Sequence, residues 1–116
     1  MKSLASITEK DIETIKMALN DSVSDMNMEL RNDISGKKRN ELMDYKNKYT
    51  KVLEKLAKNP SIYVLVDYEL DIAASGLNDA IELLDDNLTD DLTEQEKNDI
   101  LNYKSDCERL VELLAI

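Results

Sequence analysis

The chain has 116 residues, enough for one domain with a modest core, and its two Gly and one Pro are too few for the many turns of a β-sandwich or barrel. Fifteen basic against 25 acidic residues give a net charge of −10, which disfavours direct binding to nucleic acid or to an anionic membrane surface. Because five Tyr are the only aromatic residues, the core must be aliphatic, which is typical of an all-α helical bundle.

The first half of the chain predicts two amphipathic helices, in which apolar residues recur at spacings of three and four. The first helix spans about residues 8–32, and Thr8 can cap its amino end. The second spans about 37–58, after Ser35-Gly36, and carries eight basic and three acidic residues. Asn59-Pro60 then ends this helix, because proline cannot continue it.

The second half predicts two further helices, at about 60–86 and 93–115. Pro60 suits the first position of the third helix, and Thr93-Glu94-Gln95-Glu96 is a capping box that opens the fourth. Short connections make sequential helices antiparallel neighbours, which favours an up-down-up-down bundle. The alternative arrangement is two hairpins that pack less regularly or are swapped between protomers.

The sequence also repeats at an offset of 58 residues, so that residues 1–58 align with 59–116 without gaps. Twelve of the 58 aligned pairs are identical, where chance gives roughly three or four. Similar apolar spacing alone is also expected of any two halves of a bundle, but the identities include polar residues such as Asn20 and Asp21. We therefore expect a single all-α domain over 1–116, an antiparallel four-helix bundle built from two tandem helical hairpins by internal duplication.

Residues that could carry catalysis or bind a cofactor are scarce. The chain has no His and one Cys, Cys107, which lies on the apolar stripe of the fourth helix and is expected to be a buried structural thiol. The sequence contains no glycine-rich phosphate loop, and its Ser and Thr residues have no recognisable base partner. We therefore expect no enzymatic activity and no cofactor.

One segment approaches a calcium-binding loop, with oxygen-bearing side chains at the spacing of an EF-hand. The pattern lacks glycine at its sixth position, where the chain has Asp90, and Glu96 is already accounted for by the capping box. This favours a solvated acidic connector, with a weak calcium site as the alternative. The residues at the ligand spacing are Asp85, Asn87, Thr89, Asp91, Thr93 and Glu96.

Charge is divided unevenly between the two halves. Residues 1–58 hold twelve basic and ten acidic side chains, a net of +2, whereas residues 59–116 hold three basic and fifteen acidic ones, a net of −12. A face of this kind either is merely solvated or binds a basic partner. The candidate partner-binding residues cluster around the third connection: Asp85, Asp86, Asp90, Asp91, Glu94, Glu96 and Asp99.

A second candidate surface is the run Ile62-Tyr63-Val64-Leu65-Val66, which would be apolar all round a helix. Burial at the end of the bundle is favoured over a contact with another protomer, and both a monomer and a homodimer stay open.

These features predict a non-enzymatic acidic protein-protein interaction module. Its sharpest form is a nucleic-acid mimic, a phage or mobile-element inhibitor that binds the basic nucleic-acid-binding surface of a target protein. The alternatives are a structural or assembly protein acting as a homo-oligomer and a weak calcium-responsive helical module. Residues Met1 to Asp11 lack the apolar stretch of a secretory leader, and a single Cys suits a reducing compartment, so we expect a cytoplasmic location.

Overall fold

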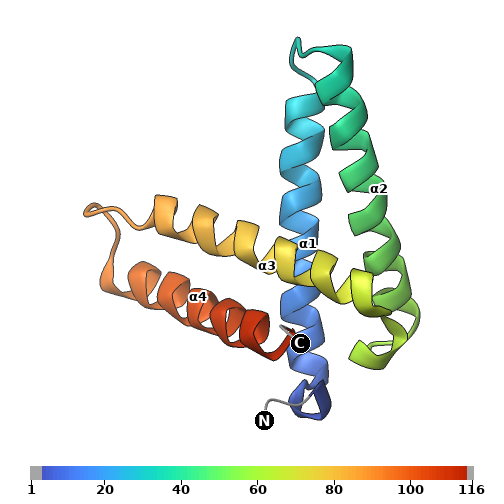
Figure 1. Cartoon of the computed structure of the whole chain (residues 1–116). Helices are drawn as coiled ribbons and strands as arrows, with labels where there is room; N and C mark the ends of the chain where they lie inside the picture. Colours follow the sequence, from blue (N-terminus) through green and yellow to red (C-terminus); the bar gives the residue numbers. More distant parts are fainter. Residues whose placement is uncertain (1–3, 115–116) are drawn as a thin grey trace.

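The computed structural model describes residues 4–114, and every regular element in this range is helical. The α-helices form two antiparallel hairpins, α1 with α2 and α3 with α4 (Figure 1). The prediction of an all-α bundle of four helices with antiparallel neighbours is confirmed. The elements are the 3₁₀ turn η1 (Leu4–Ser6), α1 (Glu9–Leu30), α2 (Gly36–Lys58), the 3₁₀ turn η2 (Ile62–Val64), α3 (Asp67–Asn87) and α4 (Glu94–Leu114).

Side chains at the helix starts take up backbone amides that have no partner within the helix. At α1 the Thr8 hydroxyl accepts from the Asp11 amide, and the Asp11 carboxylate accepts from the Thr8 amide. The same reciprocal pair joins Thr93 and Glu96 at α4, which confirms the predicted capping box. At α2 the Ser35 hydroxyl accepts from the amide of Lys38.

The third helix begins later than the sequence predicted, at Asp67 rather than at about residue 60. The intervening run forms η2 and then extended backbone at Leu65 and Val66. Its β-branched residues have low helix propensity, and this conformation turns Ile62 and Leu65 into the core. In an α-helix the apolar side chains of residues 62–66 would point to all sides. The observed conformation instead places two of them, Ile62 and Leu65, in the core.

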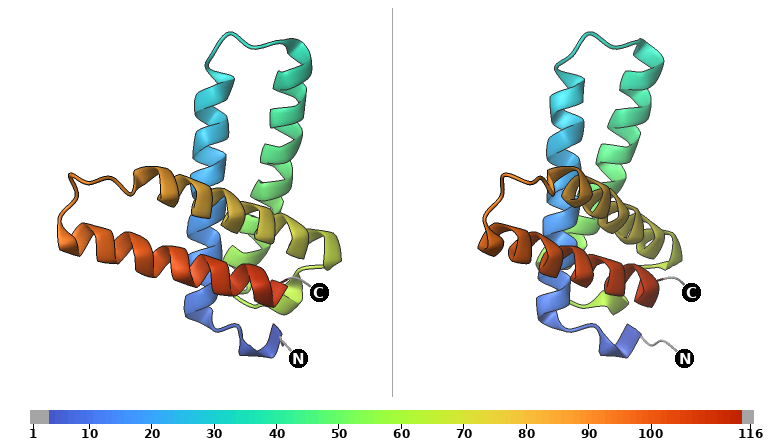
Figure 2. Two further views of the ribbon diagram at one scale, coloured as in Figure 1. Left: turned by 60° about the vertical axis from the view of Figure 1, so that its left-hand side comes forward. Right: turned by 90° about the vertical axis from the view of Figure 1, so that its left-hand side faces the viewer.

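The two hairpins lie across each other rather than side by side (Figures 1 and 2). The molecule accordingly measures 42 × 41 × 24 Å, with two long dimensions and one short one. Contact between the hairpins is centred on α1 and α3. Of the two arrangements that the sequence left open, this is the less regular one, and the up-down-up-down bundle with four aligned axes was wrong.

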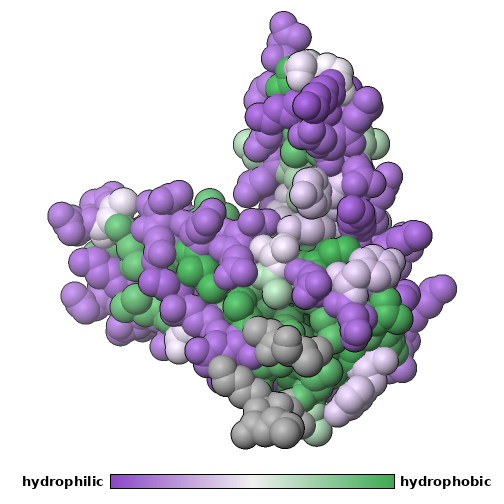
Figure 3. All heavy atoms as spheres, in the orientation of Figure 1, coloured by the Kyte–Doolittle hydropathy of each residue, from purple (hydrophilic) through white to green (hydrophobic). Residues whose placement is uncertain are grey.

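The core occupies only the region where the hairpins cross. No residue of 23–48, which we call the first arm, is buried, and none of 81–106, the second arm, is buried either. Each arm is a two-helix extension whose helices contact each other. The surface of the first arm is mostly hydrophilic, as the upper part of Figure 3 shows. The crossing therefore supplies most of the apolar burial, and the arms present surface.

The structure repeats at the same offset of 58 residues as the sequence. Shifting η1 and the start of each helix of the first hairpin by 58 gives η2 and the starts of α3 and α4. The buried positions of the helices coincide too. In α1 and α3 they are Asp11, Ile12, Ile15, Ala18, Leu19 and Ser22 against Glu69, Leu70, Ala73, Gly76, Leu77 and Ala80, and in α2 and α4 Tyr49, Val52 and Leu56 against Cys107, Leu110 and Leu114.

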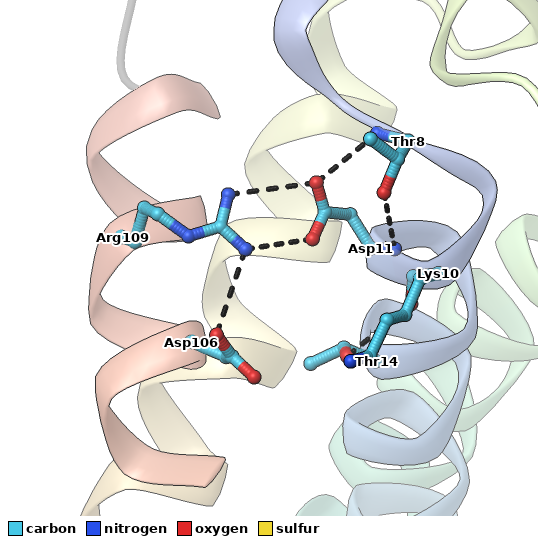
Figure 4. A network of polar contacts seen from close by, with 6 residues as sticks. All are labelled: Thr8, Lys10, Asp11, Thr14, Asp106 and Arg109. Atoms are coloured by element: carbon cyan, nitrogen blue, oxygen red, sulfur yellow. Dashed lines mark hydrogen bonds and ion pairs between the residues drawn. The ribbon is translucent and has the colours of Figure 1, made fainter. Parts of the chain in front are cut away.

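Two buried carboxylates at equivalent positions tie one hairpin to the other. Asp11 in α1, 7% exposed, accepts two hydrogen bonds from the Arg109 guanidinium of α4, the shorter at 2.6 Å (Figure 4). Glu69 in α3, 1% exposed, accepts from the Lys55 ammonium of α2 at 2.6 Å and from the Val66 amide at 3.0 Å. Each pair therefore joins the start of a helix in one hairpin to the last third of a helix in the other.

Both carboxyl groups stay ionised more readily than usual. The hydrogen bonds from Arg109 lower the pKa of Asp11 against the opposing effect of burial. Burial raises the pKa of Glu69, but the hydrogen bonds from Lys55 and the Val66 amide outweigh it, so that the net pKa is lowered. The ionised forms thus favour the folded state.

These shifts predict loss of stability in acid. A lowered folded-state pKa gives stability that is present above the unfolded pKa, about 4 for these groups, and lost as the pH falls through the folded value. We expect the melting temperature to fall between about pH 5 and pH 2, and the double variant Asp11→Asn/Glu69→Gln to fall less steeply there. Glu13→Gln/Asp44→Asn, which removes two exposed carboxylates, is the control and should keep the wild-type slope. Equal slopes in the two double variants would contradict the assignment.

Candidate functional site: an acidic cleft between the arms

The predicted partner-binding residues lie at the far end of the second arm, away from the crossing (Figure 1). Asp85 and Asp86 are in the last turn of α3, Asp90 and Asp91 are in the connection, and the rest are in the first two turns of α4. All are exposed, and we call this set the acidic tip. It comprises Asp85, Asp86, Asp90, Asp91, Glu94, Glu96 and Asp99.

Several carboxylates of the acidic tip are engaged in local structure. Asp85 is 2.6 Å from the Lys104 ammonium of α4, a compensation that the sequence did not reveal. The backbone amide and hydroxyl of Thr93 lower the pKa of Glu96, which caps α4. Asp99 accepts a hydrogen bond from Gln95, and Asp91 accepts one from the Thr89 hydroxyl, which lowers its pKa.

Asp86 also lines a cleft of about 360 Å³ in the corner between the two arms. Residues of α1, α2 and α3 line it, and all its charged lining residues come from α1 and α3. We call it the acidic cleft. Its carboxylates are Asp25, Glu29, Asp79, Glu82 and Asp86, and its other lining residues are Ser22, Met26, Leu42 and Leu83.

The carboxylates of the acidic cleft have little compensating positive charge. Glu29 lies 3.7 Å from the Lys38 ammonium, and within residues 4–114 no ion pair to the other four is found. Asp79 is held in place by hydrogen bonds from the hydroxyls of Tyr49, at 3.2 Å, and Ser22, at 3.3 Å. Burial and the nearby charge of Asp79 raise the pKa of Tyr49, so its hydroxyl remains a donor at neutral pH.

Most of this charge is absent at the positions 58 residues away. Only one of the five equivalent positions carries a carboxylate, although the backbone elements correspond. The cleft's acidity is therefore a property of its surface residues rather than of the packing. The equivalents of Asp25, Glu29, Asp79, Glu82 and Asp86 are Leu83, Asn87, Asp21, Ser24 and Met28.

Sequence reasoning found Asp86 but missed the other carboxylates of the cleft. A signal was present, because Asp79, Glu82 and Asp86 follow each other at steps of three and four and so share one face of α3. Asp25 and Glu29 have the same relation in α1. Only the crossing of the hairpins, which the sequence did not predict, brings these two faces to one corner.

The run 62–66 is divided between core and surface. Ile62 and Leu65 are buried, Val64 is partly buried, and Tyr63 and Val66 are 67% and 52% exposed. Tyr68, the second residue of α3, is exposed and follows them closely in the sequence. The predicted burial thus holds for two residues, and a small apolar surface remains.

Other chemistry in the described range is limited. Cys107 is fully buried, and burial raises the pKa of its thiol to about 12, as expected of a structural cysteine. Among residues 4–114 no three His, Cys, Asp or Glu side chains come together in a way that could hold a metal ion. In the same range no helix has the length and apolar character needed to cross a membrane.

Comparison of the chain with models of protein families, with curated proteins and with solved structures finds no match.

Proposed function

We propose that this chain is a non-enzymatic protein-protein interaction module that binds a basic surface of another protein. The observation that carries the proposal is the acidic cleft together with the acidic tip, whose carboxylates are exposed and, apart from Asp79, stand on the two arms. A concentration of like charge that the core does not need weakens the isolated fold slightly and favours a cationic partner.

The form of partner that this surface fits best is a nucleic-acid-binding protein. Carboxylates held on rigid helices can occupy positions that phosphate groups take in a basic groove, and their field accelerates association. On this proposal the chain acts as an inhibitor that excludes nucleic acid from the groove, as a phage or mobile element would use against a host protein in the cytoplasm.

A second candidate function is assembly as a homo-oligomer. The exposed side chains of Tyr63, Val66 and Tyr68 favour it, because apolar side chains near one another on a surface are typical of contacts between chains. A dimer in sedimentation that Tyr63→Ser/Val66→Ser converts to a monomer would support assembly through this surface.

We also infer that the two hairpins arose by duplication of a single 58-residue helical hairpin. The supporting observations are the twelve identical pairs and the equivalent positions of elements and buried residues. On this view the two copies kept a common core and diverged on their arms, which explains a net charge of +2 in one half and −12 in the other.

The test is capture of partners from native lysate on the immobilised chain. We expect moderate salt and added duplex DNA each to elute the captured protein, because both compete for its basic groove. A variant with six carboxylates neutralised should capture little of it. That variant is Asp25→Asn, Glu82→Gln, Asp86→Asn, Asp90→Asn, Asp91→Asn and Glu94→Gln.

A matched control neutralises six exposed carboxylates of the first half, so that the change in net charge is the same. If both variants retain the partner equally, the acidic surface is not the binding surface and the proposal is wrong. The control substitutions are Glu9→Gln, Glu13→Gln, Asp33→Asn, Glu41→Gln, Asp44→Asn and Glu54→Gln.

A further inference from the structure

We propose that the acidic cleft receives an arginine or lysine side chain of the partner, presented on a short amphipathic helix. This inference rests on the proposed function and names the part of the acidic surface where the partner is anchored. It places the anchor in the corner between the arms rather than at the acidic tip.

The size of the cleft limits what can enter it. A volume of about 360 Å³ lies near the lower end for binding pockets and accommodates one or two side chains, not a whole helix. The walls come from α1 and α2 of one hairpin and α3 of the other, so a helix lying over the corner would contact both arms. An anchoring side chain inserted from such a helix fits this geometry.

The lining of the cleft selects the chemistry of that side chain. Met26, Leu42 and Leu83, the last 39% exposed, offer apolar surface to an aliphatic stem. The carboxylates around them attract a cationic head group, and arginine and lysine combine these two properties. A hydrated metal ion or a nucleic acid would leave the apolar residues unused, and the negative charge would repel the nucleic acid.

Asp79 is the carboxylate best prepared for this role. The hydroxyls of Tyr49 and Ser22 both donate to its Oδ2, so its position is fixed before a partner arrives. Because Tyr49 is buried in the core, the hydrogen bond from its hydroxyl fixes the exposed Asp79 carboxylate to the crossing. Preorganisation of this kind lowers the entropic cost of binding a cation.

The residues found 58 positions away from Asp25 and Glu82 support a role of these two carboxylates in binding. At the equivalent of Asp25 the chain has Leu83, and at the equivalent of Glu82 it has Ser24, with no change in the elements that carry them. The carboxylates at 25 and 82 are therefore not needed for folding, and their gathering around one corner gives that corner a specificity for cations.

The experiment measures binding of a defined probe by fluorescence anisotropy. The probe is a labelled helical peptide of about 16 residues, rich in Ala, with one face of Leu and Arg at helical spacing, at about 0.05 M salt. A peptide with Glu in place of Arg and one with Ser in place of Leu serve as ligand controls. We expect the Arg-Leu peptide to bind and both control peptides to bind much more weakly.

Two triple variants with the same charge change locate the peptide. Asp25→Asn/Glu82→Gln/Asp86→Asn should weaken binding about tenfold or more, and Asp90→Asn/Asp91→Asn/Glu94→Gln, at the acidic tip, by no more than about threefold. Leu83→Ser should weaken binding without altering net charge. All substituted side chains are exposed, so circular dichroism should show unchanged folding.

Each other outcome overturns the inference in a distinguishable way. Equal weakening by the two triple variants, or no effect of Leu83→Ser, would show that the peptide follows general charge rather than the cleft, and the acidic binding surface would still stand. If the peptide does not bind while the lysate partner is captured, the anchor chemistry is wrong and the proposed function survives. If neither binds, both proposals fail.

Discussion

Leu19→Ala and Leu77→Ala are each expected to lower the free energy of unfolding by about 2–5 kcal/mol. Both side chains are fully buried, and they occupy equivalent positions of α1 and α3, the two helices on which the crossing is centred. Each truncation removes apolar burial and leaves a cavity that the close-packed crossing cannot fill. Urea unfolding followed by circular dichroism measures the change.

The matched control is Leu101→Ala, because Leu101 is an exposed leucine of the second arm. It should change stability by no more than about 0.5 kcal/mol. If either Leu19→Ala or Leu77→Ala costs less than about 1 kcal/mol, the crossing is not the centre of the core.

Gly76→Leu is expected to lower the free energy of unfolding by about 3 kcal/mol. A Cβ atom at residue 76 would lie 2.6 Å from Leu19 Cδ2 and 3.3 Å from its Cγ, so a larger side chain must push α1 and α3 apart. Glycine here serves a close approach between two helices rather than an unusual backbone conformation.

The smaller change Gly76→Ala tests the same contact through its coupling to Leu19. In the otherwise wild-type protein, the methyl group introduced at residue 76 would meet Leu19. This clash offsets the gain in helix propensity, which is about 1 kcal/mol. In the Leu19→Ala background the clash is gone, and Gly76→Ala should become stabilising by about that amount. An identical effect of Gly76→Ala in both backgrounds would mean that the close contact is absent.

The local elements of this fold follow from short sequence signals. Thr8 and Thr93 mark two helix starts through the carboxylates three residues later, and Pro60 ends the preceding helix. Apolar spacing in each half predicts which face is buried, because a helical period is a local property. The late start of α3 was missed because the buried side chains of Ile62 and Leu65 override the preference of Pro60 for a first helical turn.

The crossing itself could not be predicted from these signals. Apolar stripes run on through residues that the structure leaves only partly buried, such as Leu84 and Ile100, so the stripes suggest contact along the whole length of every helix. What concentrates the contact is the small residue Gly76 of α3, which lies directly against Leu19 of α1 and lets the two helices approach closely at one place. This effect depends on pairing between distant segments, which a one-dimensional pattern does not contain.

For the same reason, the sequence predicted the acidic tip but not the acidic cleft. The acidic tip is nearly contiguous in sequence, so composition alone locates it. The acidic cleft joins Asp25 of one hairpin to Asp79 and Glu82 of the other, more than fifty residues apart. Only the crossing brings the acidic stripes of α1 and α3 together to form the acidic cleft. Asp86 belongs both to this cleft and to the acidic tip.

Confinement of the core to the crossing has a consequence for how this protein can evolve. Residues 23–48 and 81–106 are exposed or only partly buried, so substitutions at their exposed positions change the surface with little effect on folding. A lineage can therefore alter the charge and shape of either arm rapidly while the central residues stay constrained. On the proposed function, this division would let the binding surface follow changes in its partner while the scaffold stays the same.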